Sequence, residues 1–344
     1  MALLTDLISP ATLTGFTRAA FENHESNSDS LNVYLPNQTT PQNSVAIKLE
    51  DNGLVDVAEY RSYDAELDFA NMGDVDEVVV RMLPLGVKIP ISEFDQVSAI
   101  GSNETYLLDA VRRAAVRAAR AVADRAELER GRVIATGKVA FHKSGRPALE
   151  DDFNRSADMD VTAPVLWSDG SANPIFDLQG WADFYGETNG QAPGAIVGSP
   201  RALRALAQAK SLSVKLSDGA TRPATPADVQ ATLDGYGLPT LHTYNRKVRR
   251  WNTKTKRSEL VNVLPDDRVF LLPSPGQSNL GATYWGRTLS STKANWGIAL
   301  ADQPGIVTGV VENDEPPMIT QVVADAIGQP ILANPNLVLA AKVL

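Results

Sequence analysis

The sequence LPLGVKIPISEFDQ (83–96) leads within a few residues into NETYLLDAVRRAAVRAARAVADRAELERG (103–131). In the second stretch small apolar residues recur every three or four positions, and arginines fill the rest, which predicts a helix with one narrow buried face. A helix of this length spans about 40 Å at ~1.5 Å per residue, so we expect it to organise the rest of the chain. The residues expected to be buried are Leu107, Val111, Ala115, Ala118, Val122 and Ala126.

The ends of this helix carry recognisable signals. Asn103 is the expected N-cap, and Gly131 is expected to end the helix at the C′ position. Oppositely charged residues four positions apart add a few tenths of a kcal/mol each. The expected pairs are Asp109–Arg113, Arg120–Asp124 and Arg125–Glu129.

A charged, strand-rich excursion precedes the helix. VAIKLEDNGLVDVAEYR (45–61) and VDEVVVRMLPLGVKIPIS (75–92) alternate apolar and polar residues, and Asp51-Asn52-Gly53 is a turn signal. The ribbon carries too little apolar surface to pack as a domain of its own, and an isolated hairpin is marginally stable in water. We therefore predict that it lies on a neighbouring subunit.

The remaining chain predicts a mixed α/β body. Residues 1–25 indicate two helices separated by Pro10, and 23–32 is predicted to be a loop. Three later helices are expected at 178–188, 200–210 and 226–237, two of them opened by Ser199-Pro200 and Thr225-Pro226. Strands are expected at 133–141, 195–199, 238–245, 268–273, 282–286, 305–313, 320–328 and 337–344.

Composition excludes several classes of protein. A formal charge of -9 over 344 residues argues against a general nucleic-acid binder, which usually has a basic face. Cysteine is absent, so disulfides and thiolate metal sites are excluded, in keeping with a reducing cytoplasm. The sequence has no run of about 18 apolar residues that would predict a transmembrane helix, and its N-terminus lacks a basic signal-peptide region.

Searching for catalytic chemistry gives no active site, so we expect no enzyme, cofactor or metal. His24, His142 and His242 stand in unrelated contexts, and G-x-S-x-G does not occur. GRVIATGKV (131–139) has the wrong glycine spacing for a phosphate-binding loop. The acidic residues 150–152, 158 and 160 match no calcium loop and are interpreted as a solvated loop.

A basic stretch, YNRKVRRWNTKTKR (244–257), allows two interpretations. Cations interleaved with aromatic residues are the components of a single-strand nucleic-acid surface. Alternation through Val248 and Trp251 around the turn 252–255 instead favours a hairpin with one solvated face. Its candidate residues, either solvated or facing nucleic acid, are Arg246, Lys247, Arg249, Arg250, Lys254, Lys256 and Arg257.

Together with the opening stretches, LPDDRVFLLPS (264–274), LGATYWGRT (280–288) and NPNLVLAAKVL (334–344) resemble the major capsid protein of tailed bacteriophages. The resemblance is to the lambda-type family with the Hong Kong 97-like fold, and it spans most of the chain in order. It implies an α+β fold with an N-arm (1–42), an extended hairpin or E-loop (43–100) and a P-domain with the spine helix (101–140). Residues 141–305 would form mainly the A-domain, and the strands of 306–344 would return to the P-domain.

The resemblance also implies a function. Such a chain assembles with itself as pentamers and hexamers into an icosahedral head enclosing double-stranded DNA, which it touches by weak, non-specific contacts. Implied partners are a separate scaffolding protein, a portal protein and a decoration protein; the implied location is the virion, after assembly in the host cytoplasm. Lys48 and Lys88 have no identifiable partner for the cross-link known in some relatives. The intersubunit contacts expected in the E-loop are Glu59, Arg61, Arg81, Lys88, Glu93 and Asp95.

Other functions stay open at this point. An encapsulin-like nanocompartment would share the fold but enclose cargo enzymes. A hydrolase or prohead protease would need a nucleophile and a base, and a nucleic-acid module would use 244–257. A tail or tube subunit is a further alternative, although such proteins are commonly shorter and more purely β.

Overall fold

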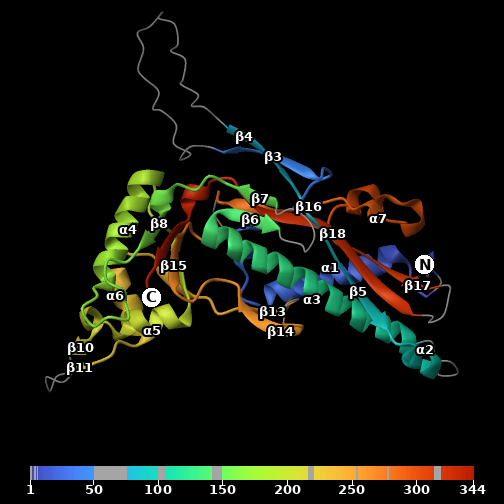
Figure 1. The fold of residues 1–344 in the computed structure, drawn as a ribbon, viewed down its shortest axis with the longest axis horizontal. Helices are drawn as coiled ribbons and strands as arrows, with labels where there is room; N and C mark the ends of the chain where they lie inside the picture. Colours follow the sequence, from blue (N-terminus) through green and yellow to red (C-terminus); the bar gives the residue numbers. More distant parts are fainter. Residues whose placement is uncertain are drawn as a thin grey trace, which may run out of the picture.

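The described part of the fold has two large β-sheets and four two-stranded ones, with one long helix lying across the largest sheet (Figure 1). The computed structural model describes residues 2–3, 5, 7–49, 76–99, 105–141, 149–215, 221–252, 255–276, 279–313 and 319–344. The N-terminal segment and the strands within 307–332 lie beside the long helix. Most of the middle of the chain, together with the last strand at 339–342, forms the second sheet and its helices.

The long helix is α3, Thr105–Thr136, and it runs five residues beyond the predicted end. The predicted apolar face is buried from Val111 to Ala126, and Leu107 is half-buried. The prediction that Gly131 ends the helix is wrong. A Cβ at that position would lie 2.3 Å from the carbonyl oxygen of Val263, so glycine permits close approach, and Gly137 (φ 68°) follows the helix instead. The expected N-cap, Asn103, lies outside the described residues.

Of the three ion pairs predicted along α3, one is confirmed. Arg125 and Glu129 are 2.7 Å apart. Asp109 pairs with Arg112 at 3.6 Å and not with Arg113. Asp124 pairs with Arg246, far away in the sequence, at 2.9 Å and not with Arg120. Arg112 is three residues from Asp109 and is an alternative that helix spacing allows, whereas Arg246 could not be foreseen from spacing along the helix.

The larger sheet is built around its longest strand, β18 (Thr320–Leu332). The strand order of this sheet is β1-β17-β18-β16-β2. In addition, every residue of β5 (Pro84–Ile91) pairs with β18. Leu85, Val87 and Ile89 of β5 pack against the alanine face of α3, because alternate side chains of a strand point to one side. The other strands are β1 (Ala2–Leu3), β2 (Asn37–Thr39), β16 (Gly281–Gly286) and β17 (Val307–Glu312).

The N-terminal segment packs on the same sheet. Pro10 is the first residue of α1 (Pro10–Ser26), which Ser9 caps by accepting from the Thr12 amide. The predicted short helix before Pro10 is wrong, because Ala2 and Leu3 form β1 and pair with β17. The predicted loop 23–32 is shorter than expected, since α1 reaches Ser26 and a 3₁₀ turn spans Leu31–Val33.

A hairpin of β3 (Ser44–Leu49) and β4 (Asp76–Arg81) rises from the body, at the top of Figure 1. Its predicted turn at 51–53 lies outside the described residues. The range 43–100 therefore divides into this hairpin and a second part, β5 and α2 (Glu93–Ala99), that joins the body.

The second sheet has the order β12-β9-β15-β19-β8. The three predicted helices are confirmed as α4 (Pro174–Asn189), α5 (Pro200–Gln208) and α6 (Pro226–Gly235). Ser199 and Thr225 cap α5 and α6 just before their prolines, as the sequence indicated. The strands are β8 (Asp160–Thr162), β9 (Ala195–Gly198), β12 (Thr240–Thr243), β15 (Arg268–Leu272) and β19 (Leu339–Lys342).

Smaller elements complete the fold. The predicted strand 133–141 begins only at Lys138, because α3 occupies its first residues. The basic stretch forms the expected hairpin, β13 (Lys247–Asn252) with β14 (Arg257–Asn262). The remaining elements are β6 (Lys138–Phe141), β7 (Leu149–Asp152), β10 (Val214–Lys215), β11 (Thr221–Arg222) and α7 (Leu289–Thr292), with 3₁₀ turns at Ala157–Met159, Lys210–Leu212, Ala294–Trp296, Leu300–Asp302 and Pro335–Leu337.

Candidate assembly surfaces and a buried polar junction

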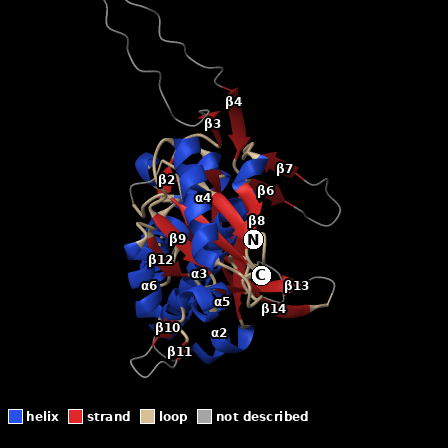
Figure 2. Ribbon diagram, turned by 90° about the vertical axis from the view of Figure 1, so that its left-hand side faces the viewer, coloured by secondary structure: helices blue, strands red, loops and turns tan. Residues whose placement is uncertain are grey.

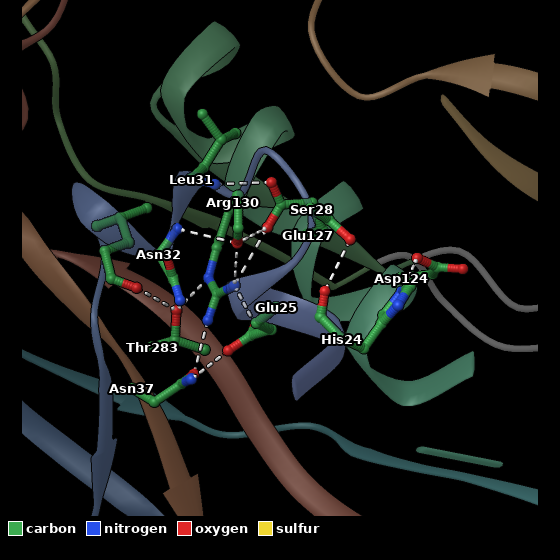
Figure 3. Close-up of polar contacts among 12 residues, drawn as sticks. His24, Glu25, Ser28, Leu31, Asn32, Asn37, Asp124, Glu127, Arg130 and Thr283 are labelled. Atoms are coloured by element: carbon green, nitrogen blue, oxygen red, sulfur yellow. Dashed lines mark hydrogen bonds and ion pairs between the residues drawn. The ribbon is translucent and has the colours of Figure 1, made fainter. Parts of the chain in front are cut away.

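Arg130 is the centre of a buried polar junction (Figure 3). Its side chain, on α3, is fully buried, and Nη1 is 2.5 Å from Glu25 on α1 and 3.2 Å from Glu127. Nε donates to Thr283 Oγ1 at 2.8 Å, and Nη2 donates to Asn37 Oδ1 at 2.6 Å. A buried arginine is tolerated only with such complete pairing.

Glu127 connects the junction to the second sheet. One carboxylate oxygen accepts from the Leu31 amide and from the Tyr244 hydroxyl, both at 2.7 Å; the other accepts from Ser30 at 2.8 Å. Burial, together with the charge of Glu127, raises the pKa of Tyr244, so its hydroxyl remains a donor at ordinary pH. Tyr244 directly follows β12, so this contact ties the second sheet to α3.

A second, more exposed ion pair holds the basic hairpin in place. Arg246 Nη2 donates to Asp124 Oδ1 at 2.9 Å, and His24 Nε2 lies 3.2 Å from the same oxygen. Arg246 immediately precedes β13, and Val248 is buried. The hairpin is thereby fixed against α3 at its base, while its outer residues remain in solvent.

The expected intersubunit residues lie on the hairpin, β5 and α2, as far as they are described. Arg81, Lys88 and Glu93 are exposed, and no ion pair joins them to another side chain in the described part of the chain. Glu59 and Arg61 lie outside the described residues, as does the side chain of Asp95 on α2. Arg81, Lys88 and Glu93 are therefore placed where a neighbouring molecule can reach them.

The seven basic residues of 244–257 separate into two groups. Lys247, Arg249, Arg250, Lys256 and Arg257 are exposed on β13 and β14 or at their turn. Arg246 points inward to Asp124, with 9% of its side chain exposed, and Lys254 lies outside the described residues. Figure 2 shows the hairpin projecting from the body on the same side as β6 and β7.

A groove of about 860 Å³ runs between α3, β5 and this hairpin. Its apolar lining includes Leu85, Val87 and Val122. Its charged lining is predominantly cationic, formed by Arg117, Arg120, Arg125, Arg249 and Arg250 with Asp124. The sequence showed the helix arginines and the hairpin arginines separately; only the fold brings them into one groove.

The residues considered for catalysis or metal binding do not converge. His24 lies beside the Asp124–Arg246 ion pair, His242 is exposed on β12, and His142 lies outside the described residues. Asp152 pairs with Lys138, and Asp160 pairs with Arg155 and Arg268. Within the described ranges, no three His, Cys, Asp or Glu side chains gather as metal ligands. The described helices include none with enough apolar length to cross a bilayer.

Comparison with known proteins gives a fold but no close relative. The sequence matches no protein-family profile and no curated protein. A prophage protein of Escherichia coli CFT073 that is described as a capsid protein aligns over 98% of this chain and 99% of its own, at 15% identity and a TM-score of 0.61. A phage-related protein of Bordetella bronchiseptica RB50 aligns over 99% and 98%, at 13% identity and a TM-score of 0.57. The chain therefore has the α+β, Hong Kong 97-like fold found in phage capsid proteins.

Proposed function

We propose that this chain is the major capsid protein of a tailed bacteriophage and builds the wall of its icosahedral head. The observation that carries the proposal is the alignment of nearly the whole chain with a prophage protein described as a capsid protein. The alignment leaves no large part of either chain unmatched, so the function need not be sought in an added domain.

The division into parts that we propose follows the resemblance. Residues 1–42 form the N-arm, 43–100 contain the E-loop, 101–140 contain the spine helix of the P-domain, and 141–305 form mainly the A-domain. Of the range 306–344, expected to return to the P-domain, β17 and β18 do so, whereas β19 joins the second sheet. Within 43–100, β3 and β4 are the part that rises from the body, and β5 belongs to the larger sheet. The raised hairpin is the element best placed to cover a neighbouring subunit.

Assembly would use contacts that tolerate different curvatures, because one chain would occupy both pentamers and hexamers. Exposed charges such as Arg81, Lys88 and Glu93 suit this role. Surface ion pairs are weak individually, at about 0–1 kcal/mol each, yet they set register and disfavour wrong partners. The buried junction around Arg130 would keep each subunit rigid while these contacts adjust.

The proposed shell encloses double-stranded DNA in the virion and assembles in the host cytoplasm. We propose a separate scaffolding protein, a portal protein and a decoration protein as its partners. No catalytic step is required of the chain in this role.

Sedimentation velocity of the purified full-length chain, alone and co-expressed with a scaffolding protein from the same genome, tests the proposal. We expect a fast, uniform species much larger than one capsomer. A species that stays monomeric or dimeric under both conditions contradicts it. Uniform shells that enclose a co-purifying enzyme, rather than the scaffolding protein, would instead identify an encapsulin-like compartment.

A further inference from the structure

Exposed arginines form a row along the outer face of α3. Arg113, Arg117 and Arg120 are four and three residues apart, so they lie on one stripe with about 5–6 Å between neighbouring Cβ atoms. The acids expected to neutralise two of them are engaged elsewhere, since Asp109 pairs with Arg112 and Asp124 pairs with Arg246. Among the described residues, none forms an ion pair with Arg113, Arg117 or Arg120.

The basic hairpin extends this row. Arg249 lies on β13 and lines the same groove as Arg117 and Arg120. Lys247 shares its face of the strand, because residues two apart point the same way. Arg250 differs, because Glu259 stands opposite it on β14. Hydrogen bonds from Asn252 and Thr255 lower the pKa of the Glu259 carboxyl, and the charge of Arg250 lowers it further. The cations that have no ion pair with any described residue therefore continue from the helix to the outer face of the hairpin.

The position of the hairpin is built into the fold. Arg246 binds Asp124 on α3, and Val248 is buried, so the base of β13 is held against the helix. The two sources of cations, about 130 residues apart in the sequence, are thus brought together by structure. The chain has a net charge of -9, so this group of arginines without ion pairs to described residues makes a locally positive surface on a negative protein.

We propose that this surface, Arg113, Arg117 and Arg120 of α3 with Lys247 and Arg249 of β13, binds the phosphates of double-stranded DNA without sequence preference. The inference rests on the proposed function, which supplies a polyanion to every copy of the chain. Arginine forks suit phosphate oxygens, and duplex DNA offers one charge per ~1.7 Å of its axis. The face of the subunit that bears these residues would then be the inner face of the shell.

An acidic protein segment is the competing occupant. Residues 50–77 contain ten acidic residues and a single arginine, so a second copy of this chain offers one. DNA is favoured because the cations spread from the groove along the open helix face and onto the hairpin. A long polymer with evenly spaced charges meets all of them, whereas one peptide segment in the groove meets only part.

The test measures binding of full-length subunits to a fluorescent mixed-sequence duplex of about 30 base pairs between about 50 and 200 mM salt. The variant is Arg117→Gln/Arg120→Gln. Its matched control is Arg201→Gln/Arg204→Gln, which removes two exposed arginines at the same spacing from α5. Equal thermal unfolding temperatures for both variants show that the fold is kept.

We expect the wild-type protein to bind with a slope of log K against log salt near -0.9 per phosphate contacted. The α3 variant should lose about 2 units of that slope and bind several-fold more weakly at low salt, with the α5 control unchanged. The proposal is overturned if the wild-type protein does not bind DNA at about 50 mM salt. Equal loss in both variants also overturns it.

A third outcome concerns a synthetic peptide of residues 50–77. If the wild-type protein binds this peptide but not DNA, and the α3 variant loses the peptide binding, the surface belongs to a second copy and the proposal is overturned. Sedimentation of the same preparations separates this inference from the proposed function. Shells that form without DNA binding refute the inference alone. Subunits that never form shells refute the proposed function, whatever they bind.

Discussion

Arg130 of α3 and Glu25 of α1 form an ion pair with a nitrogen–oxygen distance of 2.5 Å, and both side chains are almost completely buried. Glu127 shares the same guanidinium at 3.2 Å, and Arg246 Nη1 lies 3.9 Å from its other carboxylate oxygen. Four parts of the fold meet at this point: the N-terminal segment, the long helix, the larger sheet and the second sheet (Figure 3). The junction therefore holds the proposed assembly surfaces in a fixed relation.

Replacing Arg130 with Met should lower the free energy of unfolding by about 3–5 kcal/mol, because buried Glu25 loses its cation and buried Glu127 loses the nearer of its two. Chemical denaturation measures the loss. Arg117→Met is the control, since Arg117 is exposed on the same helix, and it should change stability by less than about 0.5 kcal/mol. Equal effects of the two substitutions would show that the junction does not stabilise the fold.

Gly131→Ala should destabilise the protein by roughly 1–3 kcal/mol, because the new methyl group would collide with backbone atoms of Val263 that cannot move freely. Gly180→Ala provides the contrast: Gly180 lies inside α4 with open space around it, and alanine there should add about 0.5–1 kcal/mol. Thermal unfolding of the two variants compares them directly. A stabilising Gly131→Ala would contradict the close approach of α3 to Val263.

Alkaline pH should weaken the fold through Tyr34. Burial raises its pKa from 10.0 to about 12, so the folded protein holds the phenolic proton more tightly than the unfolded chain. This contribution is complete below pH 10 and is lost as the pH rises toward 12. Between about pH 9 and 12 the unfolding free energy of the wild-type protein should fall by about 2 kcal/mol relative to that of Tyr34→Phe, which lacks the phenolic proton. Parallel curves would mean that Tyr34 ionises equally easily in both states.

Lys88→Glu should impair shell assembly without weakening the subunit. Lys88 is exposed on β5, so reversing its charge should change the free energy of unfolding by no more than about 0.5 kcal/mol. The assembled fraction, measured by sedimentation, should fall, while Lys88→Arg, which keeps the charge, should assemble normally. Normal assembly of Lys88→Glu would remove this residue from the proposed intersubunit contacts.

Local pattern predicted much of the fold. The alternation of small residues identified the buried face of α3, and Ser-Pro and Thr-Pro pairs located the starts of α5 and α6. Predictions failed where a distant contact overrode a local signal. Gly131 was predicted to end the helix, but it is a glycine because Val263 approaches the helix closely there. Asp124 was predicted to pair with Arg120, but it pairs with Arg246.

The buried junction could not be predicted from the sequence. Glu25, Asn37, Glu127, Arg130 and Thr283 come from segments up to about 260 residues apart, and each has an ordinary local context. The one available signal was chemical: Arg130 and Glu127 fall on the side of α3 that otherwise carries alanines. A charged pair on an apolar helix face indicates burial with partners, although it does not name them.

Electron microscopy of the purified particles tests the central claim most directly. The account predicts closed icosahedral shells of uniform size, assembled from the full-length chain with its scaffolding protein. Fields that contain only small, unassembled subunits under these conditions would contradict the claim that this chain forms a capsid shell.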